Sequence, residues 1–307
     1  MINDKIKQNV ILAPFTTFQI GGSAKFFVMV ENKEELQEAL AFAQDKGIPY
    51  FILGGGSNLL ISDQGFPGLV IKINYQDIAI EGETLTAGAG AKLSETVAWA
   101  ADAGLSGLEW ACGIPGTIGG AVRGNAGAFG SDISASVMTV EYFDIATAEF
   151  TVLTKADCAF AYRTSLFKQA TGKIIWQIKL QLIRGEAGHI LTTMEEILAK
   201  RISGQPKEPS AGCVFKNLLS AQDLAEKLAI SDKMRGGKLA CGLIVEKLNL
   251  KGRQIGGAKI SEAHANFIVN AGDAKAKDVR ALINLIKQEA KDKYGLILEE
   301  EIQYLGL

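Results

Sequence analysis

Histidine and cysteine are scarce in this chain of 307 residues, which contains two histidines and four cysteines. Because only His189 and His264 are available, a zinc site with three histidine ligands is excluded, and a Ser-His-Asp triad would need one of these two residues. No C-x-x-C pair and no metal-ligand spacing links the cysteines, which stand at positions 112, 158, 213 and 241. Isolated cysteines suit a reducing compartment, so we expect thiols rather than a disulfide framework, and no metal site.

The chain also has no large excess of positive or negative charge and no long apolar run. Lys plus Arg total 32 against 34 Asp plus Glu, which gives a net charge of -2 and a pI near 5.9. Such a balance offers no basic field for nucleic acid or an anionic membrane, so we expect small-molecule partners. We also expect a monomer. The start M-I-N-D-K-I-K-Q-N-V lacks the apolar run of a signal peptide, and no segment reaches the roughly 18 apolar residues of a membrane span. We therefore expect a cytoplasmic protein.

The length and the 48% hydrophobic content predict two or three domains with sizeable cores. The segment G-Q-P-K-E-P-S-A-G at 204–212 holds two closely spaced prolines and predicts a domain junction.

Apolar periodicity predicts the local elements. A helix over 33–46, with Asn32 and Glu35 as a capping box and Gly47 as its stop, lies between strands at 25–30 and 49–53. We expect further strands at 68–73, 78–81, 84–87, within 137–184, at 266–270 and at 296–305. We expect further helices at 92–103, 190–203, 221–230, 239–247 and 275–293. The last of these carries one apolar stripe, formed by Val279, Leu282, Ile283, Ile286 and Ala290.

Two glycine-rich segments carry the strongest functional signal. The first, L-G-G-G-S-N at 53–58, follows a strand, and its glycines would let several backbone N–H groups approach a diphosphate. The second, at 113–130, contains seven glycines among small residues, against which a large planar group could lie. The alternatives are a tight surface turn for the first segment and close helix-on-sheet packing for the second.

Better-known nucleotide and hydrolase patterns are absent. Leu59 stands where a Rossmann fingerprint needs its third glycine, and Ala258 stands where a P-loop needs lysine. Ser57 is not followed by x-G, which argues against an α/β-hydrolase elbow.

Eight motifs extend the pattern over nearly the whole chain. They are T-T-F-Q-I-G-G at 16–22, L-G-G-G-S-N-L-L at 53–60, G-I-P-G-T-I-G-G-A-V at 113–122, N-A-G-A at 125–128, Y-R-T-S at 162–165, A-G-C-V-F-K-N at 211–217, L-K-G-R-Q-I-G-G-A at 250–258 and L-E-E-E-I at 298–302. In this order they resemble the UDP-N-acetylenolpyruvoylglucosamine reductase family. The chain is similar to the shorter variant of that family, without the tyrosine-bearing insertion that longer members fold over substrate.

The resemblance implies an α+β fold, with a vanillyl-alcohol-oxidase-type FAD-binding module of two α+β subdomains and a C-terminal α+β substrate domain. The implied division is 1–75, 76–203 and 204–307. The implied FAD contacts are Gly54, Gly55, Gly56, Ser57, Asn58, Leu59, Gly113, Gly116, Thr117, Gly119, Gly120, Arg123, Asn125, Gly127 and Ala128.

The family reaction passes hydride from NADPH through FAD to UDP-N-acetylglucosamine enolpyruvate, which yields UDP-N-acetylmuramate for peptidoglycan synthesis. Hydride addition at C3 requires negative charge to develop at C2 and in the carboxylate, so the site needs fixed hydrogen-bonding groups and a positioned acid. The resemblance assigns Arg163 to the carboxylate and Glu301 to the intermediate or its proton relay. Without the resemblance, Arg163 reads as a surface salt-bridge residue. Strand alternation puts Glu299 and Glu301 on one face and Glu300 on the other.

Cys213 stands where many family members carry serine as proton donor to C2. A thiol, with a reference pKa of about 8.5, is mostly protonated at neutral pH and can donate. A buried structural thiol is the alternative.

For substrate contacts the resemblance points to Tyr162, Asn217, Lys251 and His264, and ordinary surface roles are the alternative for Asn217 and Lys251. Two rival functions stay open from sequence. A flavin oxidase of the same fold would share the glycine segments without the Arg163, Cys213 and Glu301 set. A non-enzymatic nucleotide-binding module would need only the loops.

Overall fold

The computed structural model describes residues 2–219, 221–228, 230–234 and 236–307 and divides into two compact units. Unit 1 comprises Met1–Val10, Ala24–Gly55 and Pro67–Arg201, and unit 2 comprises Ile11–Ser23, Gly56–Phe66 and Ile202–Leu307. The first glycine-rich loop therefore contributes Gly55 to unit 1 and Gly56 to unit 2. Within the described part of the chain, every helix is too short or too polar to span a membrane.

The first sheet of unit 1 has the strand order β1-β2-β5-β3. Its strands are β1 (Lys7–Ile11), β2 (Ser23–Val30), β3 (Tyr50–Leu53) and β5 (Phe66–Ile73). The predicted strand-helix-strand unit is confirmed as β2, α1 (Lys33–Asp45) and β3. The Asn32 side chain caps α1 by accepting from Glu35 N, but the Glu35 carboxylate accepts from Glu31 N at 3.0 Å rather than from Asn32. Strand β5 lies between β2 and β3 and runs parallel to β3.

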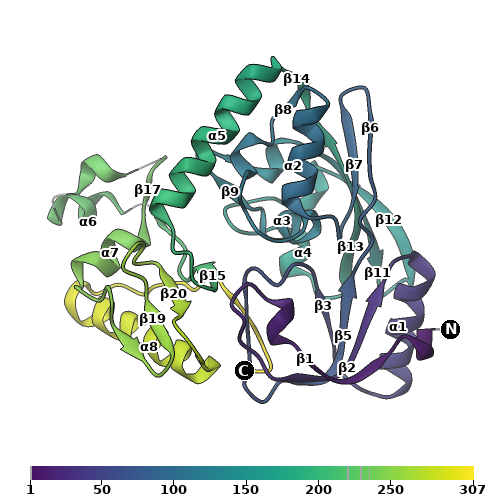
Figure 1. Ribbon diagram of the computed structural model, residues 1–307, viewed down its shortest axis with the longest axis horizontal. Helices are drawn as coiled ribbons and strands as arrows, with labels where there is room; N and C mark the ends of the chain where they lie inside the picture. Colours follow the sequence, from purple (N-terminus) through teal and green to yellow (C-terminus); the bar gives the residue numbers. More distant parts are fainter. Residues whose placement is uncertain (1, 220, 229, 235) are drawn as a thin grey trace. The chain divides into compact units, whose positions relative to one another are not determined.

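The second sheet of unit 1 has the order β12-β11-β13-β7-β6. Its strands are β6 (Ile78–Glu81), β7 (Thr84–Gly88), β11 (Val137–Asp144), β12 (Glu149–Thr154) and β13 (Lys173–Gln181). The helices α2 (Leu93–Asp102) and α3 (Ile118–Gly124) pack against this sheet (Figure 1). The other elements are α4 (Leu166–Gln169), α5 (Ala187–Gly204), β8 (Leu105–Ser106), β9 (Gly127–Ala128), β10 (Ser131–Asp132) and β14 (Ile183–Arg184).

Unit 2 is built on a four-stranded sheet of order β15-β20-β19-β18. Its strands are β15 (Ser210–Cys213), β18 (Gln254–Ile255), β19 (Ala258–Ile260) and β20 (Phe267–Asn270), and the long helix α8 (Ala276–Tyr294), in yellow in Figure 1, packs on β18 and β19. The remaining elements are α6 (Gln222–Lys227), α7 (Cys241–Lys247), β16 (Leu218–Leu219), β17 (Lys238–Leu239) and the parallel pair β4 (Leu59–Ile61) and β21 (Gln303–Leu305). Short 3-10 helices cover Ile2–Asp4, Ala13–Phe15, Glu109–Ala111, Ile133–Ala135, Ala156–Cys158 and Ser231–Lys233.

Each unit has its own hydrophobic core. The core of unit 2 includes Phe18, Ile20 and Leu60, although these residues come from the N-terminal part of the chain. The predicted stripe of α8 is confirmed, because all of its members are buried in this core. The T-T-F-Q-I-G-G motif thus includes two core residues of unit 2.

The predicted strand at 296–305 is wrong over most of its length. Only Gln303–Leu305 forms a strand, and Glu300 makes an isolated bridge to Phe215. Residues 299–301 hydrogen-bond instead to the segment that follows β15, so one short backbone pairing replaces a continuous ladder. The predicted helix at 221–230 corresponds to α6, which is shorter, and residue 229 lies outside the described residues.

Candidate active site

The two glycine-rich segments meet inside unit 1. A Cβ atom on Gly55 would lie 2.4 Å from Gly116 Cα, and one on Gly54 would lie 2.8 Å from Thr117 Oγ1. Real Cβ atoms do not approach a backbone this closely, so residue 55 must be glycine for the loops to touch. Segments predicted separately from sequence therefore form one surface.

The second segment contains glycines of two kinds. Gly119 must be glycine for packing reasons, because a Cβ there would lie 2.8 Å from both Cβ and O of Ala89. At Gly120 a Cβ would meet only Thr117 Oγ1 of the same turn at 3.5 Å, and at Gly124 it would meet nothing. Neither has a positive φ, and each glycine costs a helix about 0.5–1 kcal/mol relative to alanine. Helix-on-sheet packing thus explains Gly119 but not Gly120 and Gly124.

These two unexplained glycines suit a flavin. They are four residues apart in α3, so they share one helix face. A face without side chains can accept a flat ring at van der Waals distance. Thr117 begins the helix and its Oγ1 accepts from Gly120 N at 3.3 Å, which orders the start of this surface. The residues present therefore fit the planar part of FAD.

The rest of the first loop belongs to unit 2. Gly56 has φ 61°, its carbonyl accepts from Thr17 N at 3.2 Å, and a Cβ there would lie 2.1 Å from Phe15 O. Ser57 is half-buried in the turn, and Leu59 begins β4. Asn58 Nδ2 donates to Glu301 O at 3.1 Å. The end of the loop thereby contacts the backbone of Glu301, the predicted catalytic glutamate.

The Y-R-T-S motif forms a tight turn in unit 1. Ala161 and Thr164 exchange both backbone hydrogen bonds, each at 3.1 Å, so Tyr162 and Arg163 occupy the turn. Arg163 has φ 56°, a left-handed conformation that costs a residue with a Cβ about 1–2 kcal/mol. Strain of this kind persists where the surroundings hold it, which makes the turn a candidate functional feature. The Tyr162 ring centroid lies 5.8 Å from Arg163 Cζ.

Three hydrogen bonds fix this turn to the second glycine segment. Arg163 Nη1 donates to Gly127 O at 2.9 Å, and Asn125 Nδ2 donates to Ala161 O at 3.0 Å. Ser165 Oγ donates to Arg123 O at 2.7 Å. Asn125 itself is the C-cap of α3, with φ 43°, and is almost fully buried. Its side-chain amide therefore hydrogen-bonds to protein groups. Gly127 and Ala128 form β9, which pairs with β10. Arg163 is therefore built onto the same surface as the glycines.

In unit 2, Cys213 and Glu301 lie on paired backbone segments. Cys213 ends β15, where it pairs with Phe267 of β20. The next residue, Val214, accepts from Glu301 N at 2.7 Å, and Lys216 N donates to Glu299 O at 2.9 Å. The fold thus brings the predicted catalytic residues Cys213 and Glu301, which are 88 positions apart in sequence, into one part of unit 2.

The three glutamates at 299–301 have different surroundings. Glu299 is exposed and forms an ion pair with Lys216. Glu300 forms an ion pair with Lys287 at 2.7 Å and accepts a hydrogen bond from the Tyr304 hydroxyl. Burial acts to raise the pKa of Glu300, but these partners outweigh it and the pKa is lowered. Two members of the triplet therefore have lysine partners that explain them structurally.

Asn266 holds the Cys213 segment and was not singled out from the sequence. Its Oδ1 accepts from Phe215 N at 3.0 Å and its Nδ2 donates to Phe215 O at 2.8 Å, in the manner of a β-ladder partner. Its backbone O accepts from Val214 N at 2.8 Å. Asn266 is 3% exposed. The only sequence signal was its place in S-E-A-H-A-N-F, between a candidate site residue and a strand.

The predicted substrate residues of unit 2 gather around α7. Asn217 Oδ1 accepts from Cys241 N at 3.2 Å, at the start of that helix. Burial, with a smaller contribution from the neighbouring Cys213, raises the pKa of Cys241 to about 12. Lys251 forms an ion pair with Glu246 at 2.6 Å. Each residue thus has a defined place beside α7.

His264 is held in one tautomer. Its Nδ1 accepts from Asn266 N at 3.2 Å, so in the neutral ring the proton lies on Nε2. Burial lowers its pKa, while the charges of Glu246 and Lys251 act in opposite directions. Its ring meets Phe267 edge-on with centroids 4.8 Å apart. His264 is therefore a neutral donor through Nε2.

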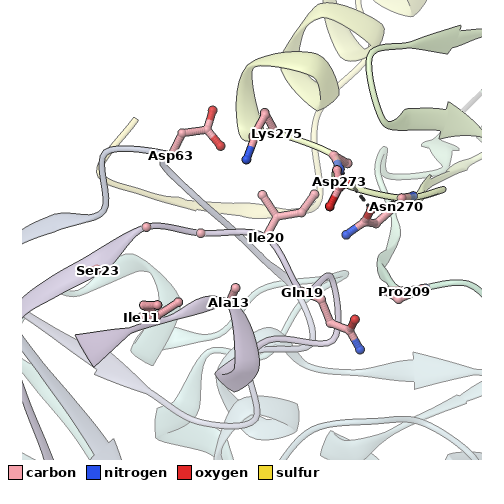
Figure 2. Close-up of a pocket in the computed structure, with 14 residues that line it drawn as sticks. Ile11, Ala13, Gln19, Ile20, Ser23, Asp63, Pro209, Asn270, Asp273 and Lys275 are labelled. Carbon is pink, nitrogen blue, oxygen red and sulfur yellow. Dashed lines mark hydrogen bonds between the residues drawn. The ribbon is translucent and has the colours of Figure 1, made fainter. Parts of the chain in front are cut away.

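A cavity of about 660 Å³ in unit 2 involves none of the predicted site residues (Figure 2). Figure 2 shows Asp63, Lys275, Asn270 and Asp273 along it, with Gln19 on the opposite side. Its polar groups hold the fold: Asp63 accepts from Ala276 N at 2.8 Å, and Asn270 Oδ1 accepts from Gly272 N at 3.1 Å. The cavity therefore arises from loop packing at the start of α8.

Arg163 belongs to unit 1, whereas Cys213 and Glu301 belong to unit 2. The structure describes each of them within its own unit. That the three side chains converge on one substrate stays a prediction.

Two family models match the chain. Residues 24–154 match an FAD binding domain, and residues 205–305 match the C-terminal domain of UDP-N-acetylenolpyruvoylglucosamine reductase. The predicted α+β FAD-binding module with a C-terminal domain is confirmed by these matches and by the structure.

Similar proteins cover the full chain. UDP-N-acetylenolpyruvoylglucosamine reductase of Solibacter usitatus is 37% identical over 307 residues, which is 99% of this chain and 98% of that protein. The enzyme of the same name from Halalkalibacterium halodurans is 38% identical and covers 98% of this chain and 95% of its own length. The crystal structure of UDP-N-acetylenolpyruvylglucosamine reductase from Thermus caldophilus superposes with a TM-score of 0.80 at 35% identity, covering 98% of this chain and 99% of that one.

Proposed function

We propose that Arg163, Cys213 and Glu301 carry the reaction of this protein. The chain belongs to the UDP-N-acetylenolpyruvoylglucosamine reductase family and is an FAD-dependent oxidoreductase of peptidoglycan synthesis. Its substrate is UDP-N-acetylglucosamine enolpyruvate, and its product is UDP-N-acetylmuramate. Bound FAD supplies the hydride, which originates from NADPH.

The side chains handle charge and a proton. As C3 of the enolpyruvyl group gains hydride, electron density moves to C2 and the carboxylate, where the Arg163 guanidinium forms charge-assisted hydrogen bonds. The Cys213 thiol donates its proton to C2, which completes the lactyl ether and leaves a thiolate that solvent reprotonates. Glu301 polarises the same intermediate or relays that proton. A carboxylate placed beside the thiol would also favour the protonated, donating form of the thiol.

The pairing of residues 214–216, directly after Cys213, with 299–301 is the observation that carries this assignment. The bond from Glu301 N to Val214 O, at 2.7 Å, keeps the backbone of the acid triplet next to that of Cys213. For Arg163, the strained turn and its anchor on Gly127 support a functional role.

The substrate's diphosphate and sugar are assigned to the second group of residues. Lys251 supplies an ammonium charge, Asn217 an amide, and His264 an Nε2–H donor, and Tyr162 contributes an aromatic contact beside Arg163. FAD is assigned to both glycine-rich segments, its diphosphate to the first and its ring to the second. The residues are Gly54, Gly55, Gly56, Ser57, Asn58 and Leu59 in the first, and Gly113, Gly116, Thr117, Gly119, Gly120, Arg123, Asn125, Gly127 and Ala128 in the second.

The decisive experiment uses purified yellow protein and NADPH. UDP-N-acetylglucosamine enolpyruvate should accelerate NADPH oxidation, whereas UDP-N-acetylglucosamine, which lacks the enolpyruvyl group, should not. Absence of acceleration would contradict the proposed function. Rapid oxygen consumption with an alcohol substrate would indicate a flavin oxidase of the same fold instead.

Finer properties are part of the same proposal: the division into 1–75, 76–203 and 204–307, the preference for NADPH, a monomeric state, a cytoplasmic location and roles in cell shape and division. The four free thiols support the cytoplasmic location, because thiols stay reduced in that compartment. Size-exclusion chromatography and a comparison of NADPH with NADH test the two biochemical points directly.

A further inference from the structure

A lysine outside all of the sequence motifs contacts the first glycine-rich loop. Lys72 lies in β5, and the parallel register with β3 pairs it with Leu53, the residue before the loop. Its Nζ donates to Gly54 O at 2.9 Å. The side chain is thus at the carboxyl end of two parallel strands, the edge where such sheets bind ligands.

Among the described residues, none provides a counter-ion for the charge on Lys72. The residue is half-buried, and burial lowers the pKa of its ammonium. Within the described ranges, no carboxylate forms an ion pair with it, and Gly54 O is its one hydrogen-bond acceptor. An ammonium has three donors, and a buried charge without compensation is costly.

Two other half-buried lysines of unit 1 have carboxylate partners. Lys33 contacts Glu141 at 2.6 Å, and Lys173 contacts Asp144. Neither glycine-rich segment can supply such a partner to Lys72, because residues 53–58 and 113–128 contain no aspartate or glutamate. A negatively charged ligand at the loop would supply this missing counter-charge.

We propose that Lys72 is the counter-charge of the FAD diphosphate and that its hydrogen bond to Gly54 fixes the loop that binds this group. The inference rests on the proposed assignment of residues 54–58 to the diphosphate. The alternative is that Lys72 only anchors the loop, for which the hydrogen bond would suffice without the charge.

Four full-length variants separate the two roles: Lys72→Met, Lys72→Gln, Lys72→Arg and the control Lys179→Met. Lys179 is an exposed lysine on β13 of the same unit. Gln can still donate to a carbonyl but has no charge, and Arg keeps the charge. FAD is removed, refolding is checked by circular dichroism, and Kd is measured for FAD, ADP and riboflavin by fluorescence or calorimetry.

We expect Lys72→Met and Lys72→Gln to weaken FAD and ADP binding by about 10- to 100-fold, the range of a hydrogen bond to a charged group. Riboflavin, which lacks the diphosphate, should bind as to the wild type. Lys72→Arg should recover most of the affinity, and Lys179→Met should be unchanged. High salt should narrow the gap between wild type and Lys72→Met.

Wild-type affinity in Lys72→Met, full recovery in Lys72→Gln, or an equal loss for riboflavin would each overturn the counter-charge role. If the Met variant does not fold, the Gln and Arg variants decide. Hydrogen exchange of the wild type tests the premise separately: FAD should slow exchange at residues 54–58. If it does not, the loop assignment fails whatever Lys72 does.

Discussion

Replacement of Asn266 tests how the Cys213 segment is held. Asn266 and Phe215 are 3% and 1% exposed, and their two hydrogen bonds measure 3.0 and 2.8 Å. Alanine at 266 would leave the N–H and C=O of Phe215 buried without partners, at about 1–3 kcal/mol each. We therefore expect Asn266→Ala to lower the free energy of unfolding of unit 2 by about 2–6 kcal/mol.

The variant Asn266→Asp should make the free energy of unfolding depend on pH in a defined direction. The new carboxyl keeps an acceptor for Phe215 N–H but must be protonated to donate to Phe215 O, so its folded-state pKa should rise above the unfolded value of about 4. The folded state then binds more protons than the unfolded state, and stability falls as pH rises through the folded pKa. The deficit relative to wild type should be smaller at about pH 5 than at about pH 8.

The assay is urea unfolding followed by far-ultraviolet circular dichroism, with hydrogen exchange of peptides that cover residues 213–216. Asn284→Ala is the matched control, because Asn284 is exposed on α8 of the same unit. The Asn266–Phe215 hydrogen bonds are not what stabilises this segment if Asn266→Ala unfolds at the same urea concentration as Asn284→Ala. The same conclusion follows if the Asp variant shows no pH dependence of stability beyond that of wild type.

Three further predictions concern the site. Cys213→Ser should keep substantial reduction of the enolpyruvyl substrate, and Cys213→Ala should lose it while NADPH still reduces the flavin; equal, unimpaired turnover of both in stopped-flow measurements would refute the donor role. Gly124→Ala should stabilise the FAD-free protein by up to about 1 kcal/mol yet weaken FAD binding, whereas Gly55→Ala should harm both, because only the first Cβ meets open space. His264 has a pKa lowered by burial, so the unfolded chain takes up a proton first and stability should fall below about pH 6.5. His264→Gln should flatten that fall in urea titrations, and the exposed His189→Gln should not.

Local elements could be predicted because their signals are local. The start of α1 follows from Asn32, whose side chain accepts from Glu35 N, and its end from Gly47, which has φ 60°. The stripe of α8 is apolar at helical spacing, and the same residues are buried. In such cases periodicity and burial describe the same helix face.

Contacts between distant segments could not be predicted in this way. Nothing near Gly55 indicates that its backbone touches Gly116, and nothing near Phe18 indicates that it belongs to the core of unit 2. Motif matching pointed to both glycine segments, but the reason for each glycine is visible only in space. Gly119 is required by packing on Ala89, whereas Gly124 is open.

The acid triplet shows why charge is the hardest signal to interpret from sequence. Alternation could pair Glu299 with Glu301 against Glu300, but it presupposes a strand, and only Gln303–Leu305 is one. Glu299 and Glu300 are instead distinguished by their partners, Lys216 and Lys287, which come from other parts of the chain. At Lys72 no carboxylate of the described residues forms an ion pair, and this absence is informative only because the fold brings the lysine to a glycine-rich loop. A charge acquires a role from its partner, and in this protein the partners are set by the tertiary fold.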